Sequence, residues 1–103
     1  MTIEILNARL TTLEAKLNER KTRLRAAEKI EKLVKEYEAA NMTSEEVTIY
    51  WSGEVCMLRS MIETTKADIN KVKKALKMAS EIEALVNGES ETEAQSEPEA
   101  TNE

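Results

Sequence analysis

The sequence predicts an all-α fold in which two long helices fold back on each other as an antiparallel, coiled-coil-like hairpin. Apolar residues recur at alternating steps of three and four along two long stretches, which is the spacing of a helix that packs on another helix. The 103 residues include only two Gly and one Pro, so they hold little of the turn chemistry that strands need. Aromatic residues make up 3% with no Phe, which favours a helix seam of Leu, Ile and Val over a globular core.

The chain divides into a hairpin domain and an acidic tail. We expect the hairpin over residues 1–88, with a helix over about 2–40, a turn over about 41–43 and a second helix over about 44–87. Residues 89–103 hold six Glu, no basic residue and no large apolar residue, so we expect a disordered tail. Residues 1–88 carry 15 basic and 14 acidic side chains, so the net charge of −5 comes from the tail.

The first predicted helix carries a continuous apolar stripe with one polar member, Arg20. The stripe consists of Ile3, Leu6, Leu10, Leu13, Leu17, Leu24 and Ala27. After Ala27 the spacing slips by one residue to Ile30, Leu33, Tyr37 and Ala40, while Val34 keeps the earlier phase. Two overlapping stripes indicate an apolar face wider than one neighbouring helix can cover.

The predicted turn between the helices has strong local signals. Thr43 is a good N-cap, and Glu46 stands at the capping-box position three residues later. Met42 and Val47 have the spacing of a hydrophobic staple across this start. A short connection of this kind favours antiparallel neighbouring helices.

The second predicted helix carries a matching stripe, which includes Thr65 and is interrupted by Glu83. Its members are Trp51, Val55, Leu58, Ile62, Thr65, Ile69, Val72, Leu76, Ala79 and Val86. Gly53 leaves open an alternative in which this helix breaks and a short third helix covers the tip, because Gly destabilises helix interiors. Asn87–Gly88 is a plausible end of the helix.

A second stripe beside the first predicts a protein-binding surface near the turn. Val47, Tyr50, Met57 and Met61 widen the apolar face of the second helix there, and exposed apolar area of this kind usually marks an interaction site. We expect the contact residues to be Leu33, Tyr37, Tyr50, Trp51, Met57, Leu58 and Met61. The surface either buries itself in a homo-oligomeric helical bundle or binds another protein, for which Met, Tyr and Trp are suitable residues.

Other functional classes find less support in the sequence. With no His and a single Cys, Cys56, we expect no metal site, no cofactor, no catalysis and a passive, partly buried thiol. No apolar run is long enough for a membrane span and no signal layout begins the chain, so we expect a cytoplasmic protein. Basic residues cluster on both helices, but interleaved Glu19, Glu28 and Glu31 favour a solvated charged face over a nucleic-acid site.

The sequence therefore predicts a non-enzymatic protein-binding module that acts through the apolar surface at the hairpin tip. The class that fits best is a small coiled-coil assembly helper, a chaperone-like protein or a structural adaptor. One alternative is an inhibitor or regulatory protein whose acidic tail modulates target binding. A nucleic-acid-associated helical protein is the third and least favoured class.

Overall fold

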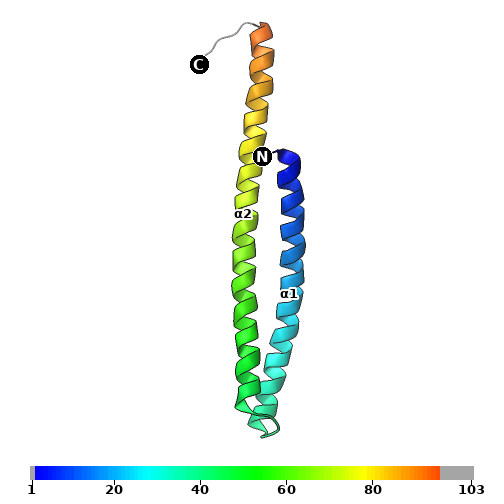
Figure 1. Cartoon of the computed structure of the whole chain (residues 1–103), viewed down its shortest axis with the longest axis vertical. Helices are drawn as coiled ribbons and strands as arrows, with labels where there is room; N and C mark the ends of the chain where they lie inside the picture. Colours follow the sequence, from blue (N-terminus) through cyan, green and yellow to red (C-terminus); the bar gives the residue numbers. More distant parts are fainter. Residues whose placement is uncertain (1, 96–103) are drawn as a thin grey trace.

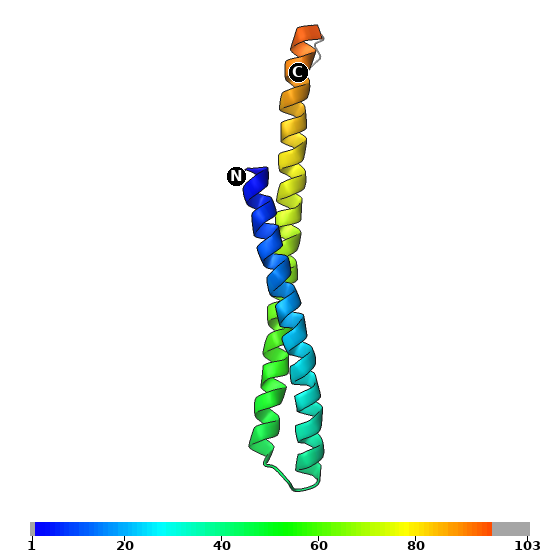
Figure 2. The same ribbon diagram turned by 90° about the vertical axis from the view of Figure 1, so that its right-hand side faces the viewer.

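The computed structural model describes the backbone of residues 2–95 and the side chains of residues 2–88, and it confirms the predicted hairpin. Helix α1 spans Ile3–Ala39 and helix α2 spans Glu45–Gln95. The helices lie side by side in a rod of 82 × 20 × 15 Å (Figure 1) and cross at a shallow angle (Figure 2). α2 continues through Gly53, so the three-helix alternative does not occur.

The reversal between the helices is made by Asn41, whose φ of 59° lies in the left-handed region. The Met42 N–H donates to the Tyr37 carbonyl at 2.8 Å, and the Asn41 N–H donates to the Glu38 carbonyl at 2.9 Å. These are the two hydrogen bonds of a Schellman motif, which satisfies the carbonyls at a helix end. Asn tolerates the left-handed conformation better than most residues, so the sequence itself stops α1 here.

The start of α2 lies within one residue of the predicted one, whereas its end does not. The helix begins at Glu45, and its first bond runs from the Val47 N–H to the Ser44 carbonyl at 3.2 Å. The later start moves the N-cap position from Thr43 to Ser44, so the predicted capping box does not form. At the other end α2 passes Gly88, which has a negative φ and therefore makes no left-handed stop, and reaches Gln95. Disorder was predicted for residues 89–103. The side chains of this segment lie outside the described part of the chain, and so does its backbone from residue 96 onward.

The predicted seam forms between α1 and α2 as two apolar clusters. The base cluster is built on Leu6, Leu13, Ile69 and Val72, with Leu10, Leu17, Ala75, Leu76 and Ala79 packed against it. The tip cluster is built on Ala27, Val55 and Leu58, with Leu24, Trp51 and Met61 packed against it. Burial of these side chains supplies the main driving force for closing the hairpin.

A polar layer separates the two clusters. The Arg20 guanidinium donates a hydrogen bond to the Thr65 hydroxyl, and that hydroxyl donates to the Met61 carbonyl at 2.8 Å. Thr65 is only 1% exposed, so its hydroxyl needs these partners. Arg20 and Thr65, the polar members of the two predicted stripes before Glu83, thus meet across the seam.

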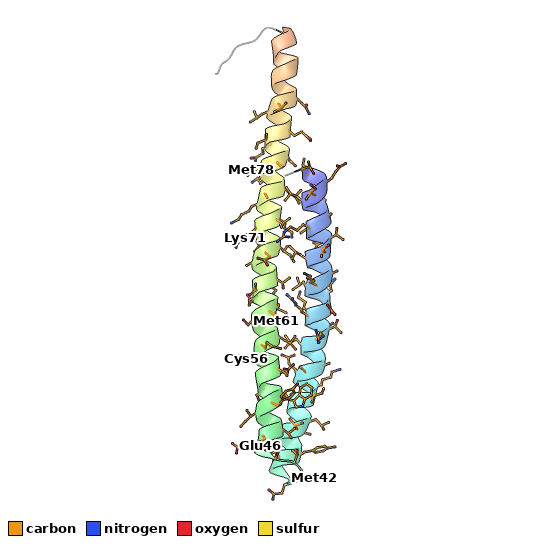
Figure 3. All side chains as sticks on the ribbon, in the orientation of Figure 1. Met42, Glu46, Cys56, Met61, Lys71 and Met78 are labelled. Carbon is orange, nitrogen blue, oxygen red and sulfur yellow. The ribbon has the colours of Figure 1, made fainter. Side chains whose placement is uncertain are left out.

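α2 extends well beyond α1 at the base of the hairpin. α1 begins at Ile3, and Figure 3 shows Met78 at about the level of that end, whereas Met42 marks the tip. Val86, predicted as a seam residue, is 55% exposed because α1 has no residue opposite it. Within the residues that the structure describes, neither helix has a stretch long and apolar enough to cross a bilayer.

Candidate protein-binding surface

Four of the seven predicted contact residues are exposed near the tip. Tyr50 is 59% exposed and Met57 is 48% exposed on α2, while Leu33 and Tyr37 are each 45% exposed on α1. The Tyr50 ring meets the ring of Trp51 edge-on, with centroids 5.3 Å apart and an interplanar angle of 89°. This contact holds the Tyr50 ring in place beside the seam while leaving most of it exposed.

The other three predicted residues belong mainly to the seam. Leu58 is only 5% exposed within the tip cluster, and Trp51 and Met61 are half-buried against that cluster. These side chains join α1 to α2, and Trp51 and Met61 offer only their remaining surface to a partner. Leu58 has almost no surface to offer.

The slip of the apolar stripe in α1 explains why Leu33 and Tyr37 are exposed. The residues that continue the spacing from before the slip stay at the seam, where Val34 is half-buried and the Glu31 side chain is only 19% exposed. Glu31 forms an ion pair with Lys35 at 3.6 Å. A carboxylate thus occupies a seam position while two large apolar residues lie beside the seam.

The exposed apolar residues gather on one side of the hairpin. With the seam residues as positions a and d of a heptad abcdefg, positions c and g line one side of the rod and positions b and e the other. We call the c and g side the flank and the b and e side the polar side. Among the side chains of residues 2–88, twelve large apolar residues are exposed, and nine of them belong to the flank, namely Ile5, Leu33, Tyr37, Val47, Tyr50, Met57, Met78, Ile82 and Leu85.

The polar side holds ion pairs and one exposed apolar residue. Arg59 and Glu28 join α2 to α1 at 3.0 Å, and Lys66 pairs with Glu63 at 3.7 Å. Ile49 is the large apolar residue of this side, at 61% exposure. Cys56 also lies on this side and is exposed, which corrects the expectation of a partly buried thiol, because its position faces away from the flank and the seam.

Two shallow grooves follow the seam, and both open on the flank. The first is lined by Leu6, Arg9, Asp68, Lys71, Val72 and Ala75, and the second by Arg23, Ala26, Ala27, Ile30, Trp51, Glu54 and Leu58. Each groove has an Arg from α1 and an acidic residue from α2. Among the described side chains none of these four charged residues, Arg9, Arg23, Glu54 and Asp68, forms an ion pair.

The sequence prediction found the tip half of the flank but missed the base half. Ile5, Met78, Ile82 and Leu85 are between 53% and 67% exposed at the end away from the turn. Ile5, Met78 and Leu85 share the heptad position of Leu33 and Tyr50, and Ile82 shares that of Tyr37. Extending the heptad register of the seam along the whole chain would have revealed them.

Comparisons of the chain with protein-family models, with curated proteins and with solved structures give no match. The surface of the hairpin is therefore the basis for assigning a function.

Proposed function

We propose that the chain is a non-enzymatic protein-binding module, a small coiled-coil assembly helper or structural adaptor that acts through the flank at its tip. The observation that carries this proposal is the half exposure of Leu33, Tyr37, Tyr50 and Met57 on a hairpin whose seam is already filled. Aromatic and Met side chains are enriched where proteins bind other proteins. Burying them against a helix of a partner would remove this area from water.

The mode of binding that suits this surface is helix-on-helix packing. The exposed residues are spaced along both helices, and the grooves beside them are shallow and open rather than enclosed. Such a surface accepts the ridge of another helix, whereas small molecules favour concave pockets. We therefore assign binding, and no turnover, to this chain.

The test compares apolar residues of similar exposure on the two sides of α2. Tyr50→Ser combined with Met57→Ser removes the flank contact, and Ile49→Ser is the matched control on the polar side. Analytical ultracentrifugation over a range of concentrations measures association, and circular dichroism checks that helicity is retained. We expect the double variant to lose association and the control to keep it. Equal association of all three chains would contradict the proposal.

A further inference from the structure

We infer that the flank of one chain binds the flank of a second copy, giving a two-fold four-helix bundle with both hairpin tips at the same end. This inference rests on the proposed function, because it names the partner of the same surface. It also extends that surface from the tip to the base, where Ile5 and Met78 are exposed beside the base cluster.

The apolar area of the flank suits a dimer. Nine half-exposed side chains with roughly 80–100 Å² of accessible surface each supply on the order of 800 Å² per chain, which is about what each partner of a stable interface buries. The polar side offers no comparable area. A second hairpin presents a face of the same length and width, so it covers the tip and the base together.

The charges of the flank are complementary between its two helices. α1 contributes the basic residues Arg9, Lys16 and Arg23 and one acidic residue, Glu19, a net charge of +2, whereas α2 contributes the acidic residues Glu54 and Asp68 and one basic residue, Lys71, a net charge of −1. Each groove contains one basic residue of α1 and one acidic residue of α2, and the first groove also contains Lys71 of α2. The flank is therefore self-complementary when α1 of one copy lies against α2 of the other.

This complementarity selects the orientation of the two hairpins. A two-fold axis parallel to the rod keeps the tips together and places α1 on the partner's α2, so that the strip with net positive charge meets the strip with net negative charge. A two-fold axis across the rod puts the tips at opposite ends and places α1 on α1 and α2 on α2, so that strips with the same sign of net charge face each other. Like charges in such contacts are unfavourable and exclude wrong pairings.

The tips-together arrangement also aligns the apolar residues. Because both hairpins are then in the same register, the tip residues Leu33 and Tyr50 of one copy meet the corresponding level of the other. The base residues Ile5 and Met78 do the same at the far end. Each copy thus contributes an apolar contact at both ends of the rod and a charged contact between them.

The decisive experiment mixes two charge-reversed full-length chains. One carries Arg9→Glu with Arg23→Glu, and the other carries Glu54→Lys with Asp68→Lys. Each alone opposes like charges in its homodimer, so we expect its dimer to weaken by about tenfold or more, while an equimolar mixture regains affinity within about threefold of the wild type. Fluorophores on Cys56, which lies on the polar side, report dimer formation by energy transfer.

A matched control and a distance measurement complete the test. Lys21→Glu with Lys32→Glu makes the same change of charge on the polar side and should leave the dimer unchanged. Spin labels at Thr43→Cys in a Cys56→Ser background should lie within about 30 Å of each other when the tips are at the same end. Tips at opposite ends would separate the labels by about 55 Å, the length of the 37-residue α1.

The outcomes separate this inference from the proposed function. A mixture that regains no affinity, or labels about 55 Å apart, would overturn the dimer inferred here, whereas a chain that stays monomeric would overturn the proposed function as well. If Tyr50→Ser with Met57→Ser still abolished an association in those cases, the tip would remain a binding surface with a different partner or orientation. If those substitutions also had no effect, both proposals would be wrong.

Discussion

Replacing Gly53 by Ala should stabilise the hairpin, and the size of the effect follows from the surroundings of this residue. Gly53 lies inside α2 with a negative φ, and a Cβ built on it meets no atom within 4 Å. Its heptad position, f, faces directly away from the seam and lies outside the flank. Neither strain nor a clash therefore opposes the substitution.

The gain should equal the difference in helix propensity, which is about 0.8–1.0 kcal/mol in favour of Ala. Ala also restricts the unfolded chain more than Gly does, and the difference in helix propensity already includes this effect. For a domain of this size, 1 kcal/mol raises Tm by about 4–8 °C. Gly88→Ala is the matched comparison, because Gly88 also lies in α2 with open space around it but beyond the end of α1.

Thermal and urea unfolding followed by circular dichroism measure both variants at one protein concentration. We expect a clear rise in Tm for Gly53→Ala and little change for Gly88→Ala, because fraying of the overhanging end is not coupled to the seam. A fall in Tm for Gly53→Ala would refute the continuous helix. A loss of association without a fall in Tm would place a partner on the outer face of α2 and contradict the flank as the contact.

Two further substitutions test local features of the tip. Thr48→Val should raise the unfolding free energy by about 1 kcal/mol in urea titrations, because the buried Thr48 hydroxyl has no hydrogen-bond partner and Val keeps the shape; no gain would mean that water reaches this hydroxyl. Asn41→Ala should lower the unfolding free energy by about 1 kcal/mol, whereas Asn41→Gly should be neutral or slightly stabilising, because only the former places an ordinary side chain at φ 59°. Equal effects of the two changes would show that Asn41 acts through its side chain instead.

The periodic features of this fold were predictable from the sequence, whereas the local hydrogen bonds were not. Alternating spacing identified both helices and most of the seam, because a helix that packs on a helix must repeat its apolar face. The turn was located at the right residues for the wrong reason. The capping box at Thr43 was predicted, but the Schellman motif at Asn41 makes the reversal, since both signals occur within three residues and propensity does not rank them.

The exposed apolar surface was predictable only in part, because sequence spacing does not show which of two overlapping stripes enters the seam. Leu33 and Tyr37 were predicted as candidates facing the second helix's apolar residues, yet the structure was needed to show that Val34 holds the seam and leaves them exposed. Leu58 was named as a contact residue because it shares spacing with Trp51. Its burial in the seam depends on α1 being opposite, which the stripe of α2 alone does not reveal.

The polar layer of Arg20 and Thr65 connects the seam to the flank through the register of the hairpin. Sliding α1 along α2 by one heptad, about 10.5 Å, would move Arg20 from Thr65 to the level of Leu58 or Val72. A guanidinium buried among apolar side chains without a partner is strongly unfavourable, so the layer opposes this slip. The turn at Asn41 opposes it as well, because it is too short to absorb the shift. The same register fixes which residues of α1 and α2 share a level on the flank, so the complementarity on which the proposed self-association depends is set inside each hairpin.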